Sequence, residues 1–222
     1  MMNNLFSIFD PTSSSLNIQL NWISMTMVFL FMQFNYWIYS SRYIKLMYLI
    51  MFNIFNESKQ MIKMKSPLIM FITMMLMIFT NNFMGLMPYI FTSTSHIMIT
   101  LSTAIFLLMT FNMYGWFTNT NKMLTHLVPL GTPSMLMPLM VMIETISNLI
   151  RPITLSVRLM ANMTAGHLLI TLMSSTCENI SMMNIMMIII IQTLLMTLEM
   201  AVAMIQAYVF TTLSLLYYNE MN

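Results

Sequence analysis

The chain has 222 residues, of which 59% are apolar and only 6% are charged, and its formal net charge is +2. Soluble domains carry roughly 25% charged residues, so eight Lys and Arg with six Asp and Glu cannot cover a water-exposed surface. This composition excludes a soluble domain and predicts a surface that faces the lipid bilayer. Gly and Pro are scarce, and the alternating pattern of a membrane barrel is absent. We therefore predict an all-α integral membrane protein, with residues 1–222 forming one membrane domain.

Methionine is unusually abundant, at 34 of 222 residues. Met fills apolar gaps well, but packing alone does not require so much of it. AT-rich genomes favour Ile, Met and Asn codons, and many mitochondria read an Ile codon as Met, so the composition indicates an organelle-encoded protein. No cleavable signal or Arg-rich transit segment is recognisable, which fits synthesis inside the organelle. The single Cys177 argues against a disulfide framework.

In chain order, the first predicted membrane span is 16–39, with Trp and Tyr residues near its ends, as is typical of membrane interfaces. Residues 40–66 contain five Lys and Arg around an apolar stretch, and they predict an amphipathic helix on a membrane face. Two further spans are predicted at 67–90 and 96–117. A polar loop is predicted at 118–133.

The last two predicted helices, 134–173 and 185–217, are too long to cross a membrane upright. Forty helical residues measure about 60 Å, whereas the hydrocarbon core is about 30 Å thick. The two helices must tilt far more than the usual 20° or so, and we expect a strongly inclined hairpin. The chain therefore has about five membrane-embedded helices plus one amphipathic surface helix. Six of the eight Lys and Arg lie in 40–66 or 118–133, a positive-inside pattern that predicts an outer N-terminus and an inner C-terminus.

Four Glu and Arg residues lie inside the predicted hairpin, where an ionisable group costs about 2.5–3.5 kcal/mol even on the lenient insertion scale. Three of them, Glu144, Arg151 and Arg158, are seven residues apart, so they return to nearly the same side of the helix. With the intervening amides they form one polar stripe, made of Glu144, Asn148, Arg151, Arg158 and Asn162. The final helix has a second stripe at the same interval, made of Gln192, Glu199 and Gln206.

Because the hairpin makes its helices antiparallel, the two stripes can face each other, which is how a membrane tolerates polar groups. Such stripes can hold helices together, or they can conduct protons. Conduction needs groups that change protonation state, such as Glu and His, together with a barrier against leakage. The guanidinium of Arg158 suits the barrier, because it stays charged at any physiological pH.

Two segments carry a family resemblance. Residues 151–169 read RPITLSVRLMANMTAGHLL, an R-P-x-x-L-x-x-R-L-x-A-N-x-x-A-G-H-x-L pattern, and residues 198–210 read LEMAVAMIQAYVF. The chain resembles subunit a of rotary ATP synthases in its mitochondrial form, and residues 2–13 are similar to arthropod members. The resemblance covers essentially the whole chain.

The resemblance implies proton transfer through two aqueous half-channels beside a rotating ring of c subunits, whose carboxylates carry the protons. Arg158 matches the required arginine that separates the half-channels. His167 and Glu199 match the inlet pair, Glu144 matches the outlet acid, and Gln206 matches the glutamine near the arginine.

Arg151 and Asn162 are further candidates for the proton path. The implied partners are the c-subunit ring, other membrane-sector and stator subunits, the lipid bilayer and protons. The implied location is the mitochondrial inner membrane, with the N-terminus in the intermembrane space and the C-terminus in the matrix. The sequence has no Walker loop and no dinucleotide fingerprint. We therefore expect no bound nucleotide, nucleic acid, cofactor or metal, and no enzymatic activity of the chain on its own.

The main alternative is a non-rotary transporter or a proton-pumping subunit of the respiratory chain. Pumping subunits usually place Lys and Glu in several helices, often with repeat symmetry. Here the charges lie in one hairpin, and no Lys lies in a predicted span. A structural membrane scaffold is a third alternative, and the cost of placing Arg158 in an apolar segment counts against it.

Overall fold

The computed structural model describes residues 5–12, 19–27, 41–61, 66–87, 90–118, 120–128, 133, 135–176 and 182–221. In chain order, their elements are the 3₁₀ helices η1 (Leu5–Phe9) and η2 (Leu20–Met27), α2 (Arg42–Met61), α3 (Ser66–Gly85), the 3₁₀ helix η3 (Ser93–Ser95), α4 (Ile97–Thr118), α5 (Thr120–Leu127), α6 (Met137–Thr176) and α7 (Met182–Met221). No strand occurs within these ranges. The predicted all-α membrane class is confirmed.

Four helices of the described chain are long and apolar enough to cross a membrane, namely α3, α4, α6 and α7. The predicted first span, 16–39, lies mostly outside the described residues, and its described part contains η2 rather than a long α-helix. Helix α3 ends at Gly85, short of the predicted 90, because Pro88 disfavours helical backbone before it. The loop predicted at 118–133 contains α5, which is too short and polar to carry the pattern of a span.

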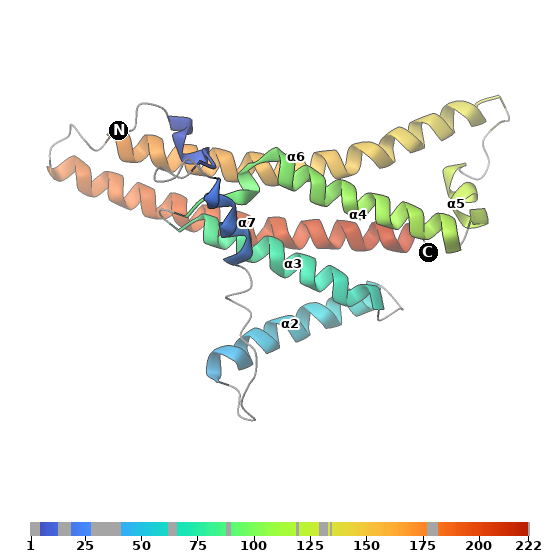
Figure 1. The fold of residues 1–222 in the computed structure, drawn as a ribbon, viewed down its shortest axis with the longest axis horizontal. Coiled ribbons are helices and arrows are strands. Elements are labelled where there is room, and N and C mark those ends of the chain that lie inside the picture. Colours follow the sequence, from blue (N-terminus) through green and yellow to red (C-terminus); the bar gives the residue numbers. More distant parts are fainter. Residues whose placement is uncertain are drawn as a thin grey trace.

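Helices α6 and α7 form a hairpin of two 40-residue helices, each about 60 Å long. Figure 1 shows them side by side, with α6 bending along its length. Pro152 lies inside α6 and cannot donate the backbone hydrogen bond to the carbonyl of Asn148, which weakens the helix there. We call the end where α6 stops at Thr176 and α7 starts at Met182 the connector end, and the other end of the hairpin the opposite end.

Helices α3 and α4 pack on the hairpin, α3 mainly against α7 and α4 mainly against α6. Their shared core is apolar and largely aromatic, and its buried members are Leu68, Phe71, Ala104, Leu107, Phe111, Leu159, Phe210, Leu215 and Tyr218. Because α3 and α4 have about half the length of α6 and α7, the η3 turn between them packs against the side of α6. This arrangement places a buried polar turn beside the middle of the hairpin.

Helix α2 extends away from the bundle and contacts α3 and α7 (Figure 1). Its exposed apolar side chains are Leu46, Tyr48, Leu49, Ile50, Phe52 and Met61. Its exposed polar side chains in the second half are Asn53, Asn56, Glu57, Lys59 and Gln60. Arg42 and Lys45, near the start of α2, are exposed as well, and the amphipathic surface helix expected here stays a prediction.

Candidate functional site

The two polar stripes of the hairpin meet at Arg158. The Nε2 atom of Gln206 donates a hydrogen bond of 3.2 Å to the backbone carbonyl oxygen of Arg158. Gln206 itself is buried, and the Arg158 side chain is exposed. The hydrogen bond places the two residues at one level of the antiparallel helices, as the facing stripes predict.

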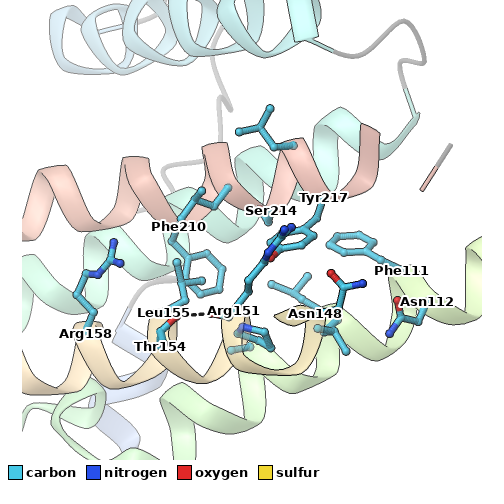
Figure 2. Close-up of a pocket in the computed structure, with 16 residues that line it drawn as sticks. Phe111, Asn112, Asn148, Arg151, Thr154, Leu155, Arg158, Phe210, Ser214 and Tyr217 are labelled. Atoms are coloured by element: carbon cyan, nitrogen blue, oxygen red, sulfur yellow. Dashed lines mark hydrogen bonds between the residues drawn. The ribbon is translucent and has the colours of Figure 1, made fainter. Parts of the chain in front are cut away.

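Arg158 lines a cavity of about 410 Å³ between α4, α6 and α7. From Arg158 this cavity extends toward the opposite end of the hairpin. Its walls are mainly apolar, and its other polar lining residues are Asn112, Asn148, Arg151, Thr154, Ser214 and Tyr217 (Figure 2). A volume of this size has room for several waters.

Arg158 also lines a second cavity, of about 270 Å³, which extends toward the connector end. Asn162 and Gln206 supply its other polar groups. Leu155, Arg158 and Phe210 line both cavities. The permanent charge of Arg158 therefore lies between two cavities that follow one another along the hairpin.

Arg151 and Tyr217 link α6 to α7 on the opposite-end side of Arg158. The Cζ atom of Arg151 lies 4.9 Å from the centroid of the Tyr217 ring, which is the geometry of a cation–π contact. Figure 2 shows the guanidinium of Arg151 reaching across to α7. Tyr217 was not selected from the sequence, because no spacing rule connects it to Arg151.

Glu199 lies against Gly166, on the connector-end side of Arg158. A Cβ atom at Gly166 would be 2.7 Å from Cδ and 2.8 Å from Oε1 of Glu199, so only glycine leaves room for this carboxylate. Both carboxylate oxygens of Glu199 and Nε2 of His167 are buried and have no hydrogen-bond partner among the described residues. Buried polar groups normally have partners, so these unpartnered atoms stand out among the polar groups of the hairpin.

Asn82 is a further polar residue in this region that the sequence analysis did not select. Its side chain is fully buried, and neither Oδ1 nor Nδ2 has a partner within the described part of the chain. It lies three residues before Gly85, whose backbone hydrogen-bonds to the His167 ring. The pair Asn81–Asn82 inside an otherwise apolar segment was the available signal.

Glu144 is half-buried near the start of α6. It does not line the 410 Å³ cavity, but Asn148, one turn further along α6, does. The structure therefore brings Arg151, Arg158, Asn162 and Gln206 to the cavities and leaves Glu144 just beyond one of them. In the described residues, no three His, Cys, Asp or Glu side chains gather as metal ligands do.

Comparison with known proteins decides the family. The family model described as ATP synthase A chain matches residues 18–219. The chain belongs to this family. A protein named ATP synthase subunit a from Locusta migratoria is 50% identical to it over 223 residues, which cover 99% of each chain. The proteins of the same name from Drosophila melanogaster and Aedes aegypti are 49% and 47% identical, and the alignments cover 100% of each chain.

Membership of the ATP synthase A chain family confirms the resemblance carried by residues 151–169 and 198–210. With four span-length helices in the described part, the chain is a multi-pass membrane protein. Arg158, Gly166, His167 and Asn162 all lie in the first of these two segments, and Glu199 and Gln206 lie in the second. Between these two segments, Arg158 meets Gln206 and Gly166 meets Glu199 across the hairpin.

Proposed function

We propose that this chain is the proton-translocating subunit a of a mitochondrial ATP synthase, in which Arg158 separates two aqueous half-channels. The observation that carries this proposal is that Arg158 lines two successive cavities. A guanidinium keeps its charge at physiological pH and repels a proton. A proton must therefore leave one half-channel on a carboxylate of a neighbouring subunit and return to the other half-channel later.

His167 and Glu199 belong to the outer half-channel, which takes up protons. Both side chains can gain and lose a proton, and the two carboxylate oxygens of Glu199 and Nε2 of His167 are buried without a hydrogen-bond partner among the described residues. Asn82 supplies an uncharged amide one helical turn from the Gly85 backbone that the His167 ring contacts. We assign Asn82 the role of holding a water beside His167.

The inner half-channel passes through the 410 Å³ cavity and releases protons toward Glu144. Asn148 and Arg151 line this cavity, and Glu144 follows one turn beyond Asn148. Glu144 is the acid that exchanges protons with the inner compartment. Asn162 and Gln206 lie on the other side of Arg158, in the 270 Å³ cavity, where they position the arginine and the water around it.

The partners follow from the exposed surface of the hairpin. Only 6% of the most apolar window of Ile185–Asn219 in α7 is buried, and the Arg158 side chain is exposed beside it. A ring of c subunits with a carboxylate at this depth covers this surface, and other membrane-sector and stator subunits cover the rest. The chain lies in the mitochondrial inner membrane with its N-terminus in the intermembrane space and its C-terminus in the matrix, as the positive-inside pattern supports. It binds no nucleotide, and ATP forms on other subunits.

The test is the variant Arg158→Ala in the assembled ATP synthase. Proton-driven ATP synthesis should be lost while assembly persists, because a single charged group of this kind supports on the order of a hundredfold or more in rate. Arg42→Ala is the control, since Arg42 is an exposed arginine at the start of α2. Synthesis above roughly a tenth of the wild-type rate in Arg158→Ala would contradict the proposal. Purification of the chain without a proteolipid ring and an ATPase head would also contradict the proposal.

A further inference from the structure

The cavity on the inner side of Arg158 contains a second guanidinium that is held in place from another helix. Arg151 stacks on the ring of Tyr217 with Cζ 4.9 Å from the ring centroid, and both residues line the same 410 Å³ cavity as Arg158. Figure 2 shows the arginine of α6 extending to the tyrosine of α7. The negative face of the tyrosine ring attracts the guanidinium charge. This contact therefore restrains where the charge of Arg151 lies.

Arg151 lies midway between the proposed outlet acid and the proposed barrier. Seven residues separate it from Glu144 and seven from Arg158, which is about 10 Å along the axis in each direction. Glu144 and Arg158 flank it on α6, and α7 supplies the titratable Tyr217 to the cavity wall. Tyr114 of α4 and Tyr218 of α7 lie next to each other, and Tyr218 packs on Phe111 of the cavity wall. Helix α5, which also contacts α6, contains Lys122 and His126. Helix α4 supplies Asn112 to the cavity wall and contains no Asp, Glu, Lys, Arg or His between Ile97 and Thr118.

The apolar surroundings of Arg151 strengthen the interaction of its charge with other charges in the cavity. Most of the cavity wall is apolar, with Leu107, Phe111, Leu155, Phe210 and Leu213 among the lining residues. In such low-dielectric surroundings, charges about 10 Å apart interact much more strongly than they do in water. Two guanidinium groups in one cavity therefore make its potential positive, and protons occupy it less.

We propose that Arg151, positioned by Tyr217, is a second fixed charge that keeps the inner half-channel poor in protons and so favours their release to the inner compartment. The inference rests on the proposed function above. It gives Tyr217 a role that the stripe pattern did not contain, and it separates the task of Arg151 from that of Arg158. Arg158 blocks passage, whereas Arg151 biases the direction in which a released proton moves.

Removing the Arg151 charge should have opposite consequences for proton release to the inner side and for proton uptake from it. Removing the Arg151 charge makes the inner half-channel hold protons more tightly. Release to the inner side, which accompanies synthesis, should then fail at a higher inner pH than in the wild type. Uptake from the inner side, which accompanies ATP hydrolysis, should persist to a higher inner pH. A variant that is merely damaged would slow both directions.

The experiment measures the pH midpoint of each direction in membrane vesicles that contain the assembled complex, varying inner and outer pH separately. Arg151→Gln should move the inner midpoint up by about half to one pH unit, the size of one charge at about 10 Å at an effective dielectric constant of 20 to 40. Tyr217→Leu, which removes the ring, should give a smaller shift of the same sign. Tyr217→Phe keeps the aromatic ring, so its inner and outer pH midpoints should equal those of the wild type. Arg42→Gln removes a charge far from the cavity and serves as the matched control.

Three results would overturn the inference: an unchanged inner midpoint in Arg151→Gln, equal shifts of the inner and outer midpoints, or a Tyr217→Leu variant that matches the wild type. If Arg151→Gln does not assemble, the pair Tyr217→Leu and Tyr217→Phe carries the test. Arg158→Ala distinguishes this failure from failure of the proposed function. Transport that survives Arg158→Ala contradicts the proposed function, whereas blocked transport with unshifted Arg151 and Tyr217 variants contradicts only the role of Arg151.

Discussion

The side-chain amide of Gln206 on α7 donates a 3.2 Å hydrogen bond to the backbone carbonyl of Arg158, 48 residues earlier in α6. Because the acceptor is the backbone oxygen of Arg158, this hydrogen bond does not involve the guanidinium group. The contact places the two side chains at the same level of the hairpin, and both line the 270 Å³ cavity. An arginine at position 206 of α7 would therefore enter the same cavity, at nearly the same level of the hairpin, as Arg158 of α6 does.

We predict that the exchange of these two side chains restores part of the transport lost in a single variant. Arg158→Gln alone should pump protons at less than about a hundredth of the wild-type rate. Arg158→Gln combined with Gln206→Arg should recover a measurable fraction, because the cavity again contains a guanidinium. Recovery should be partial, since the charge is on a different stem and aims differently. Pumping rates are compared at matched assembly, and a double variant no better than the single one would contradict the prediction.

Gly166 leaves room for the Glu199 carboxylate, and we predict that Gly166→Ala displaces it. The added methyl group would lie 2.7 Å from Cδ of Glu199, so the carboxylate must move, and a displacement of about 1 Å in such a site can cost a hundredfold in rate. Proton uptake from the outer side should slow by about tenfold or more. Assembly should persist, because the contact is with the end of a side chain.

The matched control for this variant is Gly115→Ala. A Cβ atom there would be 2.9 Å from Sδ of Met123, which is also a flexible side chain, but this contact joins α4 to α5 and does not involve Glu199. Proton uptake is measured in both variants with fluorescent pH probes. Equal slowing in Gly115→Ala and Gly166→Ala would show that the effect is not specific to Glu199.

His167 and Glu199 are expected to be coupled energetically. Glu199 packs on Gly166, the residue before His167, and both carboxylate oxygens of Glu199 and Nε2 of His167 are buried. The variants His167→Gln and Glu199→Gln should therefore be non-additive in transport, by at least about 0.5 kcal/mol in a double-mutant cycle. His167→Gln with Glu144→Gln is the control pair and should be additive, because Glu144 lies far along α6. Additive losses in the first pair would contradict a shared inlet.

Glu144 is predicted to act on the inner side only. Glu144→Gln should slow proton exchange with the inner compartment by about tenfold and leave outer exchange nearly unchanged, because a group that exchanges protons in place contributes at least this much. The effect should be smaller than that of Arg158→Ala, since Glu144 lies beyond the 410 Å³ cavity. The measurement uses vesicles of defined orientation. Equal slowing on both sides would remove Glu144 from the inner half-channel.

The arrangement of residues within one helix could be predicted from the sequence. A low charge content predicted the bilayer, and seven-residue intervals predicted which polar groups share a side of α6 or α7, because 3.6 residues per turn fixes that relationship inside one helix. The sequence also predicted that α6 and α7 are too long to cross a membrane upright. The short helix α5 was not predicted, because its eight residues are mostly polar and show no pattern that separates them from a loop.

The contacts between different helices could not be predicted from the sequence, because they depend on how the helices pack together. The contact between Gly166 and Glu199 and the stacking of Arg151 on Tyr217 each join residues of α6 and α7. Periodicity says nothing about the offset between two helices, which is set by how side chains of many sizes interlock. The same is true of Asn82, whose burial without a partner arises from the packing of the short helices α3 and α4 on the long hairpin. Residue types and spacing thus singled out the charged residues inside the hairpin, and tertiary packing set which neighbours and cavities each charge has.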